Sequence, residues 1–419
     1  MDRINKIRTV TNKQVFETVF CSTVLESIIL WLIGLFYMGQ ASVQYDFFFL
    51  RNQDLFADFI NLCGYSSERD VYNNLVNGTL EKIYPPLSYV ITYIFSRIDV
   101  LTPNVPYRDS YTQQQFLIMI ILAIVGSMIL MHSVVIYELK EKTALRFLVS
   151  IAVTFSGIMV YTIERGNFLF LTVLCCMIFA FWYDSDSKVK REISLFALAL
   201  AAAFKLSPAI LGILLIYDKK YKEAVRAAIY GGLLIFLPFL FFKGGFANIR
   251  QMFINQHDFF KEYAHVDGYS FSALIRYLLG FVDQKVAQSA MLHDITKIIM
   301  YLIVVLLLAS SWKFTRKWEK VLSVSTILVI YPQVSQKYSL LYFMPALVMF
   351  LNDDNKRKED WFCLIAFVLI CLYTWEEHIF DNYKTGAVIL LMYILVKMVV
   401  NIFGISKMII NKILISRNK

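Results

Sequence analysis

The grouping of apolar residues into long runs constrains this chain more than any other feature of its sequence. Stretches such as 118–131, 144–163 and 301–310 carry few charged residues or none. Overall, 58% of the residues are hydrophobic and 17% are charged, whereas a soluble domain has about 45–50% apolar and about 25% charged residues. A helix needs about 20 mostly apolar residues to cross a bilayer. The sequence therefore predicts a helical integral membrane protein.

The basic residues predict how the chain is oriented in the membrane. Seven short segments hold 25 of the 41 Lys and Arg residues, whereas the two long connections, 40–112 and 243–293, hold only five each. Short loops rich in Lys and Arg remain in the cytoplasm. These basic segments are the N-terminal tail, 138–146, 184–192, 218–226, 313–320, 352–360 and the tail from 405. The net charge of +9 is thus spread over loops, which argues against nucleic-acid binding.

Two segments do not fit single crossings. Segment 193–217 begins and ends beside basic loops, so we expect a hairpin of two short helices broken near 205–208, where Pro208 disfavours helix. Segment 84–96 is too short to cross and is expected to be re-entrant. Broken backbone at membrane depth needs protein or a water-filled cavity around it, so we predict a cavity open to the outside. The other expected spans are about 19–39, 113–137, 144–163, 167–183, 224–242, 294–312, 321–333, 338–351, 361–375 and 385–404.

This pattern predicts an all-α polytopic bundle of about 11–13 transmembrane or re-entrant helices with a large first outer loop. We expect residues 1–351 to form the catalytic transmembrane core. Residues 352–419 would add C-terminal transmembrane helices and a basic cytoplasmic tail. Both termini are predicted to be cytoplasmic, in the plasma membrane, and the low use of Ala and Gly with much Ile, Lys and Asn favours a bacterial source.

The first outer segment offers a candidate general base. Asp46 follows the first predicted span and is surrounded by aromatic residues, beside Tyr45. A carboxylate that loses hydration becomes more basic, as a general base requires. A helix cap or an interfacial acid explains the same residue. Asp54 and Asp58 in the same stretch are weaker candidates.

Cations in apolar or outer positions are candidates for binding an anion. Lys205 interrupts a long apolar stretch, and a charged residue within a span costs roughly 2.5–3.5 kcal/mol, so it usually has an anionic partner. Arg165 lies in a short outer turn, Arg276 at the edge of an apolar run, and Lys337 in a polar outer turn. We interpret Lys205 as a site residue that faces either an internal acid or a bound phosphate.

Three further motifs have simple structural explanations. Pro85 and Pro86 after Tyr84 predict a helix start. In the turn that carries Arg165, Gly166 permits the tight backbone and Asn167 is suited to cap the next helix. The second outer loop contains His257, Asp258, His265 and Asp267, but such loops are usually just solvated. No CxxC pair or zinc-like spacing occurs, so we predict neither disulfides nor a metal.

These motifs, in this order, resemble the GT-C superfamily of membrane glycosyltransferases, and most closely glycosyltransferase family 87. The resemblance covers roughly residues 20–345 and rests on four features. They are Asp46 followed by aromatics, Tyr84-Pro85-Pro86-Leu87, Arg165-Gly166-Asn167, and Lys205-Leu206-Ser207-Pro208 before a basic loop.

The resemblance implies a GT-C-like bundle and a transfer reaction on the extracytoplasmic face. The donor would be a sugar on a polyprenyl phosphate and the acceptor a glycan or glycolipid hydroxyl, with no cofactor and no metal. Asp46 would deprotonate the acceptor, and the sugar would be transferred with inversion. Lys205 and Arg165 would bind the donor phosphate, assisted by Arg276 or Lys337. Substrate contacts are expected at Tyr45, Tyr84, Asn167, His265 and Asp267.

Other functions remain open at this point. A flippase or transporter of lipid-linked sugars would use the same cavity and cations without a base. A polysaccharide polymerase or ligase is also multi-spanning with one large outer loop, although that loop tends to come late in the chain. A purely structural scaffold is disfavoured by Lys205, because an intramembrane charge is costly.

Overall fold

The computed structural model describes residues 11–38, 56–75, 82–97, 114–140, 143–263, 268–373 and 381–417. Within these ranges the chain is helical and contains no strand, and the prediction of an all-α polytopic membrane protein is confirmed. Four predicted site residues lie outside the described ranges: Tyr45, Asp46, His265 and Asp267.

Five of the described helices contain a stretch long and apolar enough to cross a membrane. They are α1 (Asn12–Met38), α5 (Gln114–Glu138), α11 (Tyr221–Phe236, continued by η5, Leu237–Phe241), α15 (Ala290–Ser310) and α19 (Asn382–Arg417). The segment expected as a span over 144–163 consists of α6 (Ala144–Thr154) and α7 (Gly157–Glu164), which together are apolar enough to cross a membrane but meet at a bend of 44°, as in a broken span or a re-entrant segment.

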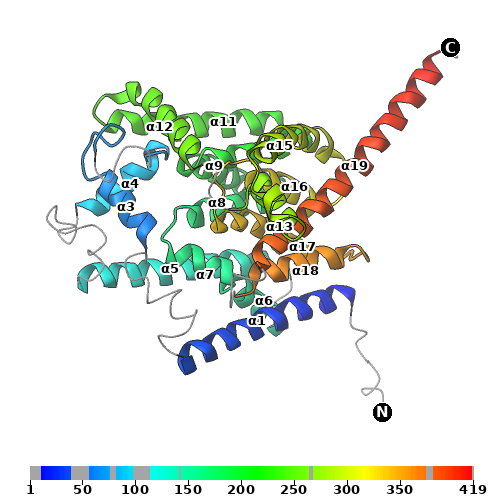
Figure 1. Cartoon of the computed structure of the whole chain (residues 1–419), viewed down its shortest axis with the longest axis horizontal. Coiled ribbons are helices and arrows are strands. Elements are labelled where there is room, and N and C mark those ends of the chain that lie inside the picture. Colours follow the sequence, from blue (N-terminus) through cyan, green and yellow to red (C-terminus); the bar gives the residue numbers. More distant parts are fainter. Residues whose placement is uncertain are drawn as a thin grey trace.

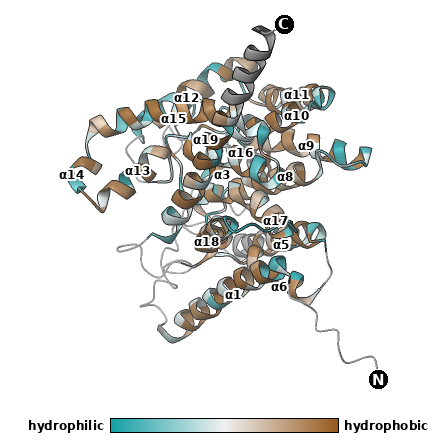
Figure 2. Cartoon of the chain, turned by 90° about the vertical axis from the view of Figure 1, so that its right-hand side faces the viewer, coloured by the Kyte–Doolittle hydropathy of each residue, from teal (hydrophilic) through white to brown (hydrophobic). Residues whose placement is uncertain are grey.

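Large apolar side chains are exposed along several of these helices. Examples are Ile33 on α1, Leu233 on α11 and Ile298 on α15, and Figure 2 colours much of the ribbon of α1 and α15 as hydrophobic. A soluble protein rarely exposes apolar surface of this extent. This surface therefore faces the hydrocarbon of a bilayer.

The centre of the bundle is a second group of helices with buried side chains. They are α8 (Leu169–Trp182), α16 (Lys317–Ile330), η8 (Lys337–Phe343), α17 (Met344–Asn352) and α18 (Asp360–Cys371). All residues from 321 to 330 of α16 are buried. These helices therefore contribute much of the buried core, although α18 also exposes Phe362 and Ile365 on one side.

The segment expected as a broken hairpin has that structure. Helix α9 (Lys188–Phe204) ends at Lys205, whose backbone is extended (φ −144°, ψ 133°), and η4 (Ser207–Gly212) and α10 (Ile213–Tyr217) lead back. The Tyr183 hydroxyl, just before α9, donates a hydrogen bond of 2.8 Å to Asp218, just after α10. Both ends of the segment therefore lie at the same end of the bundle, with Lys205 at the turn between them.

The segments predicted to be cytoplasmic are joined to one another at that same end, which we call the basic end. Lys317 pairs with Asp184, and Lys320 pairs with Asp218 at 2.8 Å. The start of α1 and the end of α19 lie there too, at the right of Figure 1. The division of the loops into two sides thus agrees with the packing, whereas the side that faces the cytoplasm stays a prediction.

The opposite end, which we call the outer end, is built partly from the two long connections. Helices α3 (Ala57–Tyr65), α4 (Pro86–Ser96) and α12 (Asn248–Glu262) lie together at the left of Figure 1. The second connection also contains α13 (Phe271–Gly280) and α14 (Gln284–Ala287). Hydropathy did not predict α12 and α13 because they are amphipathic or short rather than uniformly apolar.

Candidate functional site

Lys205 lies between two tyrosine rings at the outer end of the α9–α10 hairpin. Its Nζ is 5.4 Å from the ring centroid of Tyr84 and 5.1 Å from that of Tyr338. Among the described residues, no carboxylate pairs with this ammonium and no side chain accepts a hydrogen bond from it. The ring faces attract the cation without neutralising it, so its charge remains available to an anionic group.

The local sequence explains why Tyr84 reaches this lysine. Pro86 is the first residue of α4 and Pro85 precedes it, as predicted for a helix start. The Tyr72 hydroxyl donates a hydrogen bond of 3.0 Å to the carbonyl oxygen of Tyr84. The Ser88 hydroxyl donates one of 3.2 Å to the carbonyl oxygen of Phe204, next to Lys205. Helix α4 is thereby fixed against the end of α9.

A second cation, Lys337 on η8, lies beside the tyrosine that contacts Lys205. Lys337 immediately precedes Tyr338, and its Nζ is 5.1 Å from the ring centroid of Tyr161 and 5.0 Å from that of Tyr383. Tyr161 comes from α7 and also interacts electrostatically with Arg165. Tyr161 therefore links Lys337 with Arg165, and Tyr338, which Lys205 contacts, interacts electrostatically with both Tyr161 and Arg165.

Arg165 is held by the first outer segment. Its Nη2 donates to the Asp58 carboxylate at 2.9 Å, and the Asn167 amide donates to the other Asp58 oxygen at 2.6 Å. Burial alone would lower the pKa of Arg165, but the Asp58 carboxylate reverses that effect and the pKa lies above its usual range. Asp58 also acts electrostatically on Lys205 and Tyr338.

The turn that carries Arg165 needs a glycine. Gly166 has φ +64°, and a Cβ placed on it would lie 2.8 Å from a ring carbon of Phe56. The Phe56 N–H donates to the Glu164 carbonyl at 2.7 Å, and the Asp58 N–H donates to the Arg165 carbonyl at 3.1 Å. The close approach of α3 to this turn therefore depends on the missing side chain.

Asn167 has two contacts with different consequences. Its side-chain oxygen accepts a hydrogen bond of 2.9 Å from the Leu169 N–H at the start of α8, which agrees with the predicted cap. Its amide nitrogen binds Asp58. The same side chain thus begins the helix and holds the acid that positions Arg165.

The structure brings together five of the residues expected from the sequence: Tyr84, Arg165, Asn167, Lys205 and Lys337. Arg276 lies on α13, and no contact among the described residues joins it to that group. Sequence reasoning did not single out Tyr161 and Tyr338, and it ranked Asp58 below Asp46. The only sequence signal of Tyr161 and Tyr338 is that each lies near the end of a predicted span, and Asp58 has no signal beyond its place in the first outer segment.

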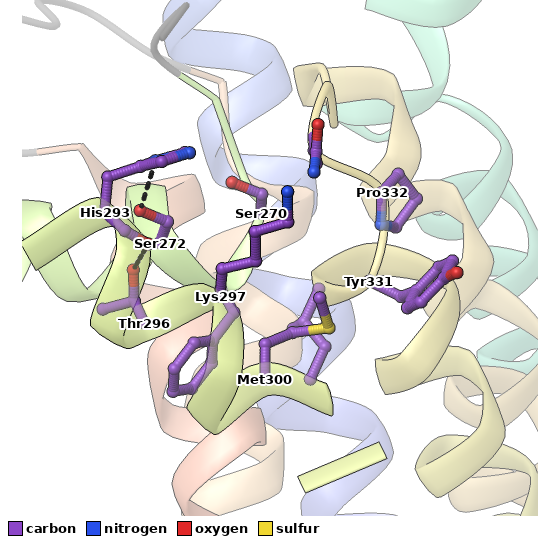
Figure 3. Close-up of a pocket in the computed structure, with 11 residues that line it drawn as sticks. Ser270, Ser272, His293, Thr296, Lys297, Met300, Tyr331 and Pro332 are labelled. Carbon is purple, nitrogen blue, oxygen red and sulfur yellow. Dashed lines mark hydrogen bonds between the residues drawn. The ribbon is translucent and has the colours of Figure 1, made fainter. Parts of the chain in front are cut away.

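A small pocket lies beside the turn at 331–333, between α13 and α15. Figure 3 shows Ser272 and His293 on its wall, with the serine hydroxyl 3.3 Å from the imidazole Nδ1. Its volume of about 20 Å³ is enough for a water molecule and too small for a sugar ring. Among the described residues, no group of three His, Cys, Asp or Glu side chains is arranged to hold a metal ion.

This outer-end arrangement is suited to an anionic substrate. Cations held in advance on a partly buried surface stabilise negative charge more strongly than the same cations in water. No curated protein and no solved structure matches the chain. A family model described as Glycosyltransferase family 87 matches residues 83–332, which is more than half of the chain and includes Tyr84, Arg165 and Lys205. The chain is therefore a member of glycosyltransferase family 87 and a membrane glycosyltransferase, as the resemblance predicted.

Proposed function

We propose that the enzyme transfers a sugar from a polyprenyl-phosphate donor to a hydroxyl of a glycan or glycolipid acceptor on the extracytoplasmic face of the plasma membrane. The observation that carries this proposal is Lys205, which is held between Tyr84 and Tyr338 with no carboxylate partner among the described residues. It lies at the end of the bundle opposite the basic loops. A lipid-borne phosphate at this depth would supply the missing anion.

In the proposed reaction the acceptor oxygen attacks the anomeric carbon while the bond from that carbon to the phosphate oxygen breaks. The electron pair of that bond leaves with the phosphate. Lys205 and Arg165 would stabilise the developing charge, with Lys337 close by. Asp46 would take the acceptor proton, and attack from the face opposite the phosphate would invert the anomeric configuration.

Asp58 is better suited to positioning than to taking the proton. Both of its carboxylate oxygens are engaged, one by Arg165 at 2.9 Å and the other by Asn167 at 2.6 Å. These two bonds point the carboxylate at the Arg165–Asn167 turn, so neither oxygen is free to approach an acceptor hydroxyl. Asp58 would therefore orient Arg165 toward the donor phosphate.

The test uses the full chain in nanodiscs with a radiolabelled polyprenyl-phosphate hexose and extracted cell-surface glycans. The wild type should release polyprenyl phosphate and label the glycan with inverted anomeric configuration. Asp46→Asn should abolish transfer and still bind the donor. A flippase would be little affected by Asp46→Asn, so unchanged lipid-linked sugar movement without any transfer would refute the proposal. Asp54→Asn is the matched control in the same segment and should retain transfer.

A further inference from the structure

A groove of about 510 Å³ at the outer end is separate from the residues around Lys205. It lies between the N-terminal part of α12 and the loop that follows α3. Its volume is in the range of sites for small organic ligands, about 300–1,000 Å³. Its lining residues are Asp70, Asn73, Lys243, Gly244, Ala247, Asn248, Arg250, Gln251 and Ile254.

The polar groups of the groove are already ordered by one another. The Asn73 amide donates to Asp70 at 2.8 Å and lies 3.3 Å from the side-chain oxygen of Asn248. The Asn248 amide, on a buried side chain, donates to the Lys243 carbonyl at 2.8 Å. A ligand would therefore meet fixed donors and acceptors, which lowers the entropy lost on binding.

The chemistry of the lining favours a neutral, hydroxyl-rich ligand. A sugar hydroxyl both donates and accepts hydrogen bonds, and the groove offers the Asp70 carboxylate, the amides of Asn73 and Gln251, and the guanidinium of Arg250. Arg250 has no hydrogen bond or ion pair with any other described residue. The lining combines one acid, Asp70, with two bases, Lys243 and Arg250, and a hydroxyl-rich ligand can pair with all three because each hydroxyl both donates and accepts.

The groove is joined to the segment that carries Tyr84. The Asn255 amide of α12 donates to the Tyr72 carbonyl at 3.1 Å, and the Gln256 amide donates to the Ile83 carbonyl at 2.7 Å. Tyr72 in turn holds the backbone of Tyr84. A ligand in the groove would thus be held on the same rigid unit as one wall of the Lys205 site.

We infer that this groove binds the acceptor, a neutral oligosaccharide chain, at sugar units beyond the one that is modified. The inference rests on the proposed function, because a glycosyltransferase that extends a glycan needs a site for it. It adds that acceptor recognition depends on the α12 groove, whereas donor recognition depends on Lys205.

Two variants test the groove without breaking the hydrogen bonds that order it. Arg250→Ala removes a side chain that bonds no other described residue, and Ala247→Trp fills the groove from an exposed position. Lys261→Ala, on the same helix but outside the groove, is the matched control. Saturation-transfer NMR would measure binding of neutral gluco-, manno- and galacto-tetraose to each protein in nanodiscs without donor.

At least one tetrasaccharide should bind the wild type. Arg250→Ala should weaken that binding by about tenfold or more, as expected for a lost hydrogen bond to a charged group, and Ala247→Trp should weaken it at least as much because the indole occupies the groove. Lys261→Ala and Lys205→Met should bind the tetrasaccharide unchanged. In the transfer assay, the groove variants should raise the acceptor KM and leave the donor KM and kcat unchanged.

The failures of the two proposals are distinguishable. If no tetrasaccharide binds, or if the groove variants bind it as the wild type does, the groove inference is wrong even when transfer proceeds. If tetrasaccharide binding depends on the groove but no polyprenyl-phosphate sugar is used, the donor proposal is wrong and the groove inference stands.

Discussion

The two ends of the bundle use buried cations in different ways. At the basic end, the Arg316 guanidinium donates to both oxygens of Asp360 at 2.7 Å and to Glu319 at 2.7 Å. At the outer end, Lys205 meets the rings of Tyr84 and Tyr338, and no carboxylate of the described residues forms an ion pair with it. Within the part of the chain that the structure describes, only Arg316 of these two cations is paired with acids.

We interpret Arg316 as a structural residue and Lys205 as a functional one. The Arg316 guanidinium, paired with two acids, joins α16 and α18. A cation that no carboxylate of the described residues pairs with costs stability, so its retention indicates a ligand. The contrast predicts that removing Arg316 damages the fold, whereas removing Lys205 damages the reaction.

The largest effect on stability is expected for Arg316→Met. The change leaves Asp360 and Glu319 buried without their guanidinium, which should lower the free energy of unfolding by about 3–5 kcal/mol. Unfolding in mixed micelles would measure it. Arg226→Met is the matched control at the same end, because its pairs with Glu192 and Glu223 are more exposed and should be worth about 1 kcal/mol or less. If Arg316→Met and Arg226→Met lowered the free energy of unfolding equally, the burial of the Arg316 pairs would not matter for stability.

The next effect concerns turnover. Lys205→Met should lower kcat about 10²–10³-fold, the usual loss when one group that stabilises developing charge is removed, and should not lower the free energy of unfolding. Lys317→Met is the control, since Lys317 also lies over a tyrosine ring, at 4.5 Å from Tyr183, but has Asp184 as a partner. Turnover should survive in Lys317→Met and be partly restored in Lys205→Arg. A Lys205→Met enzyme with full turnover would contradict the proposed role.

A smaller effect is expected where α3 meets the Arg165 turn. Gly166→Ala places a methyl group against Phe56 at a positive φ, which should cost about 2–3 kcal/mol of stability and reduce transfer. Gly245→Ala has a positive φ of 53° with nothing within 4 Å, so it should show only the backbone strain, about 1–2 kcal/mol. If Gly166→Ala and Gly245→Ala lower the free energy of unfolding equally, the contact with Phe56 does not contribute to the loss.

The smallest effect is expected at Asn167. Asn167→Ala removes the cap on α8 and the contact with Asp58, and should cost about 1 kcal/mol in thermal or chemical unfolding. Asn167→Ser keeps a capping oxygen and should recover most of that stability. Because serine does not reach Asp58 as the longer amide does, the donor KM should remain raised. If Asn167→Ser recovered both the stability and the wild-type donor KM, Asn167 would only cap the helix.

Much of the fold followed from local patterns. The spans and the sidedness of the loops depend on hydropathy and on the Lys and Arg distribution, and the break at Lys205 depends on Pro208 two residues after Leu206. The Gly166 turn and the Asn167 cap are also local. The helices within 243–293 were not predicted, since an amphipathic surface helix lacks the continuous apolar run of a span.

The site was only partly predictable. Lys205 and Arg165 could be named because a charge in apolar sequence is unusual wherever it lies. The partner of Arg165 could not be identified from the sequence, because Asp58 is one of several acids in its segment and is separated from Arg165 by 107 positions. Nothing in the spacing distinguishes Tyr338 from other aromatic residues near span ends.

The sequence by itself determined that this protein is a polytopic helical membrane protein, which loops share a side, and where two cations interrupt apolar segments. These properties depend on the free energy of placing each residue in hydrocarbon or in water, which is set residue by residue. Only the tertiary structure decided that Lys205 lies against Tyr84 and Tyr338, that Asp58 holds Arg165, and that α12 forms a groove. Those contacts depend on packing between segments that are distant in the chain, because the final positions of the helices determine which side chains meet.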